Sequence, residues 1–457
     1  MSRSDSTTGY GSIRDQMVGW LLVISLVPLI GLAVVGYQMA SASLKDMAVD
    51  RLRQTSAEHV KFIRSWADYR FMDIARLSRS PVTLSLLQRL IEAREISDLN
   101  TAEFVGSLQW RNVTAPDQAF FENQWLSYDY IYDLFLVDVH GNVLFSLAKE
   151  VDLGTNLRNG PYAATRFAQG VAKSLKSGDT VFSDFERYAP SGDLLSAFLT
   201  APVRDGRGEI AGVLAMQVRL DRVQNSLQHG RDHAERAASN YLVGVDGLMR
   251  TALHDEEEVL VKSVDTEMYR HWLAKRSSSA SSATRGGLVG SDLGTVLLGY
   301  EGPWGERVIG IASEVSVGEV NWLLVSEVNE AQALEPAARL AEIMGVLVAM
   351  AALIVIVFTV NLSRKLTEPL LKLARISDRA AEGEWGQSFD VDANNEIGNL
   401  AENFQRMLEA RLQYEQDLNE NRERLEMVVD SASVGVWDWN IKTRGFEVNE
   451  RWAEMIG

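Results

Sequence analysis

The 457-residue sequence contains no cysteine, which excludes disulfides, thiolate metal sites and a cysteine nucleophile. Basic residues are fewer than acidic ones: the sequence has 45 Lys and Arg and 62 Asp and Glu, which gives a net charge of −17. This balance argues against a nucleic-acid-binding protein with a dominant basic face. The remaining composition, 46% hydrophobic and 23% charged, is typical of folded domains, and the length predicts about three of them.

Charged residues are missing altogether from two long segments, 16–44 and 343–363. Their most apolar parts, 17–37 and 343–360, are long enough as helices to cross the hydrocarbon core of a bilayer. We therefore predict transmembrane helices at residues 16–38 and 342–361. A cleaved signal peptide is the alternative for the first segment, although its apolar stretch is longer than a signal h-region and no Ala-x-Ala site follows. A buried core helix is the alternative for the second.

The basic residues that flank these segments predict the orientation of the chain. Arg3 and Arg14 precede the first segment, and Arg364, Lys365, Lys372 and Arg375 follow the second. The positive-inside rule therefore places the tail 1–15 and the region after the second span in the cytoplasm. Residues 39–340 then lie outside. Two spans, a large outside domain and cytoplasmic termini make the layout of a receptor.

The segment 39–340 is predicted to be an α+β domain with a duplicated antiparallel sheet. Helical periodicity runs from residue 40 to about residue 79, and a second helix opens at Pro81. Strand patterns follow, first as a hairpin at 131–139 and 143–146, then at 179–183, 194–202 and 210–218. A weaker second set occurs at 241–250, 294–300, 308–312 and 322–328. We predict a distal module at about 80–230 and a proximal module at about 237–332, with a solvated polar loop at 276–285.

Several runs in this segment, 136–146, 152–157, 182–191, 212–223 and 241–250, resemble the double Cache family of extracytoplasmic sensor domains. The resemblance implies two PAS-like modules, with a small ligand held in the distal one by aromatic and polar side chains. The proximal half departs from the family by its Ser-rich insertion and by the acidic run 255–258. Candidate ligand-binding residues are Trp125, Tyr128, Tyr130, Tyr132, Asp184 and Tyr188, with the tyrosines at 128, 130 and 132 alternating on one side of a strand start. Core or rim packing is the alternative role for each of them.

Other patterns that suggest chemistry are weaker. His229 and His233 have the spacing of a zinc pair, but the sequence supplies no third ligand nearby, which favours a solvated helix face. The glycines at 287, 290 and 294 lack the Lys-Ser/Thr of a phosphate loop. The acidic run 255–258 favours a solvated loop over a calcium site. We therefore predict no metal site and no catalytic residue.

After the second span, apolar residues recur at steps of three and four, first from Leu366 to Ala380 and then from Ile397 to Val428. Residues 362–414 resemble the HAMP family, with a connector after Gly383. The marks of the family are Pro369, Glu396, Ile397, Gly398, Leu400, Phe404 and Met407. The resemblance implies a homodimeric, parallel four-helix coiled coil that relays a signal. A coiled-coil linker is predicted at 415–430.

Residues 431–457 resemble the N-terminal part of a PAS domain, with a strand, a turn at 442–445, a second strand at 446–448 and a helix at 450–456 that Asn449 caps. These residues are too few for a complete PAS sheet. The domain is therefore predicted to be incomplete, and the chain to be a fragment or a truncated product.

The layout as a whole predicts a two-span, homodimeric receptor that binds a small ligand outside and signals through HAMP and PAS. A histidine kinase, which needs ATP and Mg²⁺ and a response regulator, is the output we favour. A diguanylate cyclase or phosphodiesterase, with GTP and Mg²⁺ or cyclic di-GMP, is the alternative, and a chemoreceptor output is less favoured because a PAS start follows HAMP. No cofactor is predicted within these residues. A non-signalling, membrane-anchored binding protein and an enzyme in the outer domain are the alternatives from other classes.

Overall fold

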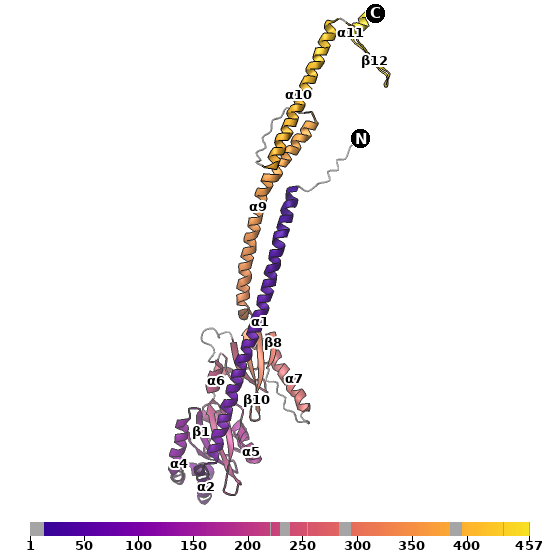
Figure 1. The fold of residues 1–457 in the computed structure, drawn as a ribbon. Coiled ribbons are helices and arrows are strands. Elements are labelled where there is room, and N and C mark those ends of the chain that lie inside the picture. Colours follow the sequence, from indigo (N-terminus) through magenta and orange to yellow (C-terminus); the bar gives the residue numbers. More distant parts are fainter. Residues whose placement is uncertain are drawn as a thin grey trace. The chain divides into compact units, whose positions relative to one another are not determined.

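A computed structural model describes residues 13–219, 221–228, 238–253, 255–282, 294–383, 395–432 and 434–456. The chain divides into two compact units (Figure 1). One unit is Tyr37–Leu340, and the other combines Met1–Gly36 with Ala341–Gly457. The predicted pair of histidines at 229 and 233 and most of the glycine-rich segment 287–294 lie outside the described residues.

The first unit is built on the long helix α1 (Ile13–Ser78). From Leu52 to Leu77 its buried residues recur at helical spacing, so one side of the helix packs on the domain while the other stays exposed. Ser80 caps the next helix, α2 (Pro81–Ile96), and its proline occupies the first turn, where a missing N–H costs nothing. Two further helices, α3 (Thr101–Gly106) and α4 (Leu108–Ser127), complete this helical layer.

The distal module contains a six-stranded antiparallel sheet. Its strands are β1 (Ile131–Asp138), β2 (Val143–Ser146), β3 (Val181–Phe182), β4 (Glu186–Tyr188), β5 (Leu194–Arg204) and β6 (Ile210–Arg219). The order is β2-β1-β6-β5-β3, and β4 also pairs with β5. One sheet face packs with α1, α2 and α4, and the other with α5 (Arg166–Ser177). Both faces of β1 are buried, which explains its nearly continuous apolar sequence. Short helices follow β4 and β6, namely η1 (Ala189–Ser191) and α6 (Asp221–Gln228).

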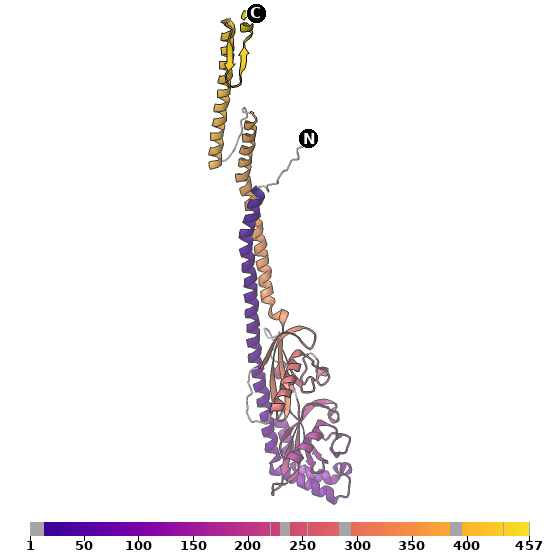
Figure 2. The same cartoon turned by 90° about the vertical axis from the view of Figure 1, so that its right-hand side faces the viewer.

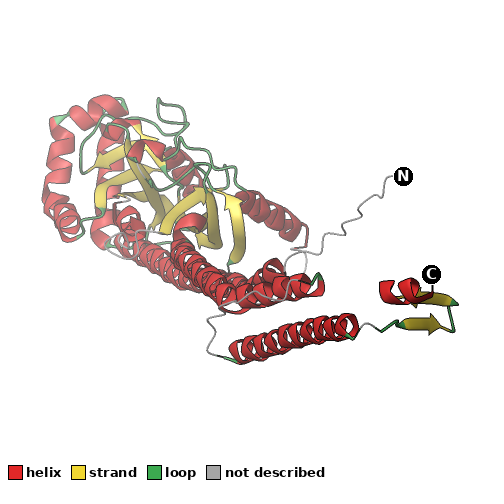
Figure 3. Ribbon diagram, turned by 90° about the horizontal axis from the view of Figure 1, so that it is seen from above, coloured by secondary structure: helices red, strands yellow, loops and turns green. Residues whose placement is uncertain are grey.

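The proximal module repeats this plan with four antiparallel strands. They are β7 (Ala238–Gly244), β8 (Thr295–Glu301), β9 (Arg307–Val317) and β10 (Val320–Asn329), in the order β7-β10-β9-β8. Its remaining elements are η2 (Glu256–Glu258), α7 (Glu267–Ser282) and α8 (Glu330–Ala333). Figure 2 shows α1 passing along both sheets, and Figure 3 shows helices around the strands of this unit. Each predicted strand region therefore contains a strand, but the one at 241–250 ends at Gly244, the one at 179–183 is a strand only at 181–182, and β4 was not predicted.

Two features of this unit differ from the sequence prediction. The polar run at 276–285 was expected to be a loop, but residues 276–282 continue helix α7. Buried Met268 and Trp272 anchor the start of this helix, so tertiary packing supports a segment whose serines have only moderate helix propensity. The helices at 101–106, 108–127 and 166–177 were not predicted. Apolar residues are irregularly spaced in 108–127, whereas Phe167, Val171 and Leu175 do recur at helical spacing, a signal that the sequence prediction missed.

The second unit is almost entirely helical. Helix α9 (Glu335–Ala381) begins in the first unit and continues past Pro369, and Gly383 with a φ of +95° follows its end. Helix α10 (Glu396–Ser431) spans the second predicted HAMP helix and the linker without a break. A hairpin of β11 (Trp437–Asn440) and β12 (Gly445–Val448) then leads into α11 (Glu450–Ile456). Asn449 caps α11 by accepting the Trp452 N–H at 3.0 Å, as predicted. The connector residues 384–394 lie outside the described part.

Two helices, α1 and α9, each contain a stretch long and apolar enough to cross a bilayer. Their large apolar side chains are exposed there, including Trp20, Ile24, Ile354 and Phe358 at 61–68%. Lipid contact is the environment that makes such a surface stable. The two-span topology itself stays a prediction from the sequence.

Candidate functional site

A carboxylate lies in the middle of the buried strand β1. Asp133 is fully buried, and its Oδ1 accepts hydrogen bonds from the backbone N–H groups of Leu134, Leu147 and Ala148 at 2.6–2.9 Å. The Ser146 hydroxyl donates to Oδ2 at 2.6 Å. Burial raises the pKa of Asp133 to about 7, although these hydrogen bonds act in the opposite direction. The geometry of the β1–β2 hairpin therefore fixes this carboxyl group.

A second buried carboxylate, Asp152, belongs to the loop between β2 and α5. The hydroxyl of fully buried Tyr188 donates to its Oδ2 at 2.7 Å. Its Oδ1 is buried and accepts no hydrogen bond of regular geometry, although the backbone N–H groups of Asp152 and Leu153 lie close enough to the carboxylate to act against the rise of its pKa. Burial raises the pKa of Asp152, and the charge of Glu150 raises it further. An unsatisfied carboxylate oxygen in such a place costs free energy unless a ligand or a proton supplies the missing bond.

The carboxylate of Glu150, whose charge acts on Asp152, accepts hydrogen bonds from Tyr132 and Ser191. The Tyr132 hydroxyl donates to Glu150 Oε1 at 2.7 Å, and the Ser191 hydroxyl donates to Oε2 at 2.5 Å. Buried Gln217, on β6, donates to Ser191 Oγ at 3.1 Å. The hydrogen bond to Glu150 raises the pKa of Tyr132 to about 12, so this phenol stays protonated.

We call Asp133, Glu150 and Asp152 the acidic cluster. The charge of Asp152 raises the pKa of Asp133, which shows that the two groups interact. Within the described ranges, none of the three carboxylates forms an ion pair with a cationic side chain. In the same part of the chain, no group of His, Asp and Glu is arranged to hold a metal ion. In the described residues, the charge of these carboxylates is therefore not balanced by a cationic side chain.

A surface hollow of about 320 Å³ lies beside the acidic cluster, with a size that suits a small ligand. It is lined by Glu122, Trp125, Leu126, Tyr132, Leu147 and Ala148. The Tyr132 side chain joins the hollow to Glu150, and Trp125 offers an aromatic face that is 45% exposed. Aromatic faces and carboxylates together favour cationic ligands.

The predicted tyrosines at 128, 130 and 132 do not share one side of a strand, which corrects the sequence prediction. The pairing of β1 with β6 is irregular between Ile131 and Asp133, and Tyr128 is the capping residue that ends α4. The hydroxyl of Tyr130 donates to Asp73 on α1 at 2.5 Å, while Arg70 lies 3.2 Å from the centre of its ring. The rings of Tyr128 and Tyr130 lie together, 5.4 Å apart, and only Tyr132 lines the hollow.

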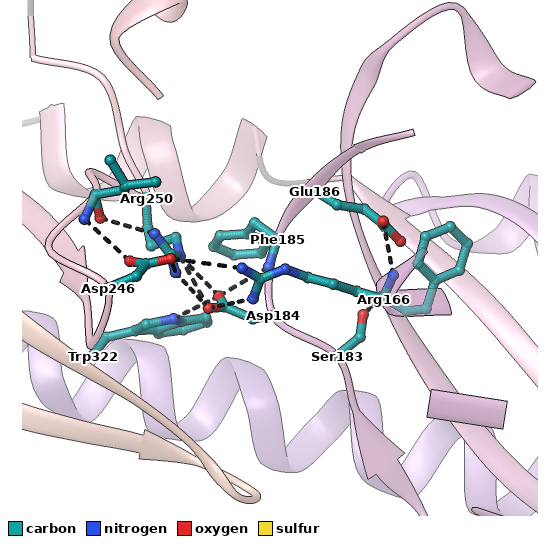
Figure 4. Close-up of polar contacts among 10 residues, drawn as sticks. Arg166, Ser183, Asp184, Phe185, Glu186, Asp246, Arg250 and Trp322 are labelled. Carbon is teal, nitrogen blue, oxygen red and sulfur yellow. Dashed lines mark hydrogen bonds and ion pairs between the residues drawn. The ribbon is translucent and has the colours of Figure 1, made fainter. Parts of the chain in front are cut away.

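Asp184 makes its contacts mainly with the proximal module (Figure 4). Arg250 donates to it from Nη2 at 2.7 Å, and the Trp322 indole donates at 2.9 Å. Arg166, at the start of α5, lies 2.9 Å from the same carboxylate. Burial acts to raise the pKa of Asp184, but the hydrogen bonds and charge of Arg250 outweigh it, so this pKa lies below its usual value. A ligand-binding role for Asp184 stays a prediction, and the carboxylate already has these partners.

Of the six predicted residues, the structure places Trp125 and Tyr132 at the hollow and Tyr188 at the acidic cluster. The sequence prediction missed the three carboxylates of the cluster and Gln217. A detectable signal existed for two of them: Asp133 and Gln217 are polar residues inside otherwise apolar strands. Such interruptions are costly unless their polar groups are bonded, and they therefore indicate a functional or structural network.

In the second unit, the predicted HAMP residues occupy two helices. Pro369 lies inside α9, and the others lie on α10, where Glu396 is the first helical residue. Gly398 is buried, whereas Leu400 and Met407 are 54% and 55% exposed. Further along α10, Tyr414, Leu418, Leu425 and Val428 are also exposed. An apolar stripe of this length at coiled-coil spacing is typical of a helix that packs against another chain.

Comparison with known proteins identifies one domain of the chain. Residues 362–410 match the family described as HAMP domain, which confirms the HAMP domain predicted at 362–414. None of the curated proteins compared with the chain matches it.

Among solved structures, an extracellular ligand binding receptor from Desulfohalobium retbaense is 12% identical, with a TM-score of 0.35. The match covers 53% of this chain and 39% of that one. The ligand-binding domain of the Pseudomonas fluorescens chemoreceptor CtaA, in complex with L-isoleucine, is 15% identical over 64% of this chain and 95% of that one, with a TM-score of 0.38. The extracellular domain of a histidine kinase named mmHK1S-Z2 is 12% identical, with a TM-score of 0.38. The match covers 64% of this chain and 99% of that one. These likenesses are distant and assign no ligand to this chain.

Proposed function

We propose that this protein is a transmembrane signalling receptor of the bacterial inner membrane whose distal module binds a small molecule carrying a cationic amine. The observation that carries the proposal is the orphan oxygen Asp152 Oδ1, which is buried beside two further carboxylates that lack a cationic partner within the described residues. An ammonium group supplies both the missing hydrogen bond and the missing charge. Burial in a low-dielectric site strengthens that interaction.

The surroundings of the acidic cluster support a ligand of limited size. The hollow of about 320 Å³ provides apolar and aromatic contact through Trp125 and Tyr132. Tyr132 lines the hollow and donates a hydrogen bond to Glu150, so a ligand in the hollow lies next to a side chain that contacts the acidic cluster. The resemblance of the outer domain to the double Cache family agrees with a ligand in this module.

The signalling part of the proposal is supported by the HAMP domain that directly follows the apolar stretch of α9. The exposed stripe on α10 fits a homodimer in which this helix packs in a parallel coiled coil. The hairpin and helix at 437–456 fit the start of a PAS domain. A histidine kinase that phosphorylates a response regulator is the output we propose, with a diguanylate cyclase as the alternative.

A binding experiment on the full chain in lipid nanodiscs tests the ligand proposal. The probes are putrescine, choline, L-isoleucine and L-arginine, with acetate and succinate as anionic controls, each followed by thermal shift and calorimetry. We expect an amine-containing probe to raise the melting temperature, since a ligand at 100 times its Kd adds about 2.7 kcal/mol of stability. Asp152→Asn should abolish that shift, whereas Glu319→Gln, at an exposed position outside the cluster, should leave it unchanged. Binding of the carboxylates alone, or a shift that Asp152→Asn does not affect, contradicts the proposal.

A further inference from the structure

The segment Asp184, Glu186 and Tyr188 touches three different parts of the outer domain with alternate residues. Tyr188 donates to Asp152 of the acidic cluster at 2.7 Å. Glu186 accepts the backbone N–H groups of Arg166 and Phe167 at 2.9 and 2.8 Å, which ties it to the start of α5. Asp184 binds Arg250 and Trp322 of the proximal module. One short stretch therefore connects the candidate ligand site to the second module.

The contact between the modules is built as a rigid clamp, formed by Asp184, Arg166, Asp246, Arg250 and Trp322 (Figure 4). The Arg250 side chain is 0% exposed, and its guanidinium bonds both carboxylates and the Leu248 carbonyl. Arg166 also spans the two modules, lying 2.9 Å from Asp184 and 3.6 Å from Asp246. Removing one partner from such a buried ionic group is costly, so the clamp holds one arrangement or gives way as a whole.

Aromatic rings extend the clamp toward the helices that enter the membrane-spanning stretches. Phe185, the neighbour of Asp184, stacks on Trp322 with ring centres 5.0 Å apart. Phe182 contacts Trp322 at 5.8 Å and Trp66 of α1 at 6.3 Å. Trp322 belongs to β10, which ends at Asn329; this residue caps α8, and α9 begins at Glu335. The clamp therefore lies on the chain path to both apolar helices.

We infer that residues 184–188 are the relay that couples the distal ligand site to the proximal module, with Tyr188 as the input contact and the Asp184–Arg250 clamp as the output contact. The inference rests on the proposed function and names the regulation of the same site. A ligand that bonds Asp152 competes with or reorients the Tyr188 hydroxyl. The displacement passes along the backbone from Tyr188 through Glu186 to Asp184, and the start of α5 moves with it because Glu186 accepts the backbone N–H groups of Arg166 and Phe167. A ligand shifts this equilibrium only through its differential affinity for the two arrangements.

Hydrogen exchange on the full chain in nanodiscs tests the relay without any ligand. Tyr188→Phe removes the input hydrogen bond and keeps the ring. We expect it to change amide exchange in 238–250 and 320–329 by about fivefold or more, the lower end of typical couplings between sites. The same substitution in an Asp184→Asn background should leave those segments unchanged. A response confined to the distal module, or one that persists in Asp184→Asn, overturns the relay.

Two further variants keep the test decisive. If Asp184→Asn does not fold, Trp322→Phe replaces it, because it removes the indole donor and keeps an aromatic ring against Phe185. Glu319→Gln is the matched control: the pair of Lys173 and Glu319 also joins the modules, but Glu319 is 75% exposed. In the Glu319→Gln background, Tyr188→Phe should change amide exchange in 238–250 and 320–329 as much as it does in the parent protein. Because no ligand is added, failure of the relay and failure of amine binding are separate results.

Discussion

At the scale of single residues, the ionisable side chains inside the outer domain fall into two groups: those paired with an opposite charge and those without such a partner. Arg250 is buried and Asp184 largely so; the two are paired, and their hydrogen bonds keep both ionised. Asp133 and Glu327 are buried without a cation, and burial raises the pKa of each to about 7. The first pair stabilises one arrangement of the domain, whereas the isolated carboxyls respond to pH or to a cationic ligand.

Asp184→Asn should destabilise the outer domain strongly. Breaking a buried ionic pair costs about 3–5 kcal/mol, and Arg250 keeps only Asp246 as a carboxylate partner in this variant. Thermal unfolding of the full chain in nanodiscs measures the effect. Glu319→Gln, which breaks an exposed ion pair between the same modules, should change stability by less than about 1 kcal/mol. Equal changes in stability for the two substitutions would show that the clamp stabilises the domain no more than an exposed ion pair does.

Stability should fall as pH rises through the neutral range. Asp133 and Glu327 have folded-state pKa values of about 7, above their ordinary 3.8 and 4.5, so the fold binds more protons than the unfolded chain between these limits. Each such group lowers the free energy of unfolding by up to about 1.4 kcal/mol per pH unit as pH rises from about 4 to about 7. The pKa of Asp184 is lowered, so this group has the opposite effect: the stability that it contributes is lost as pH falls through the acidic range below its ordinary pKa.

Melting temperatures of the full chain at pH 5 and pH 8 measure this dependence. The melting temperature should be higher at pH 5, and the double variant Asp133→Asn, Glu327→Gln should reduce the difference. A higher melting temperature at pH 8, with no effect of the double variant, is the opposite result. It would mean that both carboxyls are ionised in the folded protein.

At the scale of elements, local patterns predicted strands well and long-range contacts not at all. Alternation and turn residues located β1 and β2 and the strands of the proximal sheet, because each signal lies within one short run. The clamp joins Asp184 to residues 66 and 138 positions away, and no local pattern encodes such a pairing.

Two of the errors in local structure have identifiable physical causes. An irregularity in the pairing of β1 disrupts the alternation that the tyrosines at 128–132 were expected to follow. Packing of Trp272 supports a helix through the serines after it, where propensity alone favoured a loop. In both cases tertiary context overrides the sequence-local preference.

Strand β7 depends on a glycine where it meets the clamp. A Cβ at Gly244 would lie 2.2 Å from Arg250 Nη2, and this guanidinium cannot move aside without breaking its bonds to Asp184 and Asp246. Gly244→Ala should therefore cost about 1–3 kcal/mol, as overpacking does in other cores. Gly206→Ala is the matched control, because nothing lies within 4 Å of its Cβ position, and it should stay within about 0.5 kcal/mol of the parent. Chemical denaturation of the full chain compares the two, and equal stabilities would contradict the clamp geometry.

At the scale of the whole molecule, the absence of cysteine makes the topology directly testable. Arg207 is exposed in the turn between β5 and β6, and Glu402 is exposed on α10. Arg207→Cys should react with a membrane-impermeant maleimide from the periplasmic side, whereas Glu402→Cys should react only after the inner membrane is permeabilised. Labelling of both variants from the same side would contradict the two-span arrangement.

The central claim is that occupancy of the distal acidic cluster changes the packing of the HAMP helices. Disulfide formation between two copies of Leu400→Cys, an exposed position on the predicted HAMP seam, measures that packing in an otherwise cysteine-free chain. The cross-linking rate in membranes should change by about fivefold or more when the amine probe that binds best is added. That change should disappear when Asp152→Asn is combined with Leu400→Cys. A rate that the probe does not alter, despite binding that Asp152→Asn abolishes, would contradict the account of this protein as a receptor.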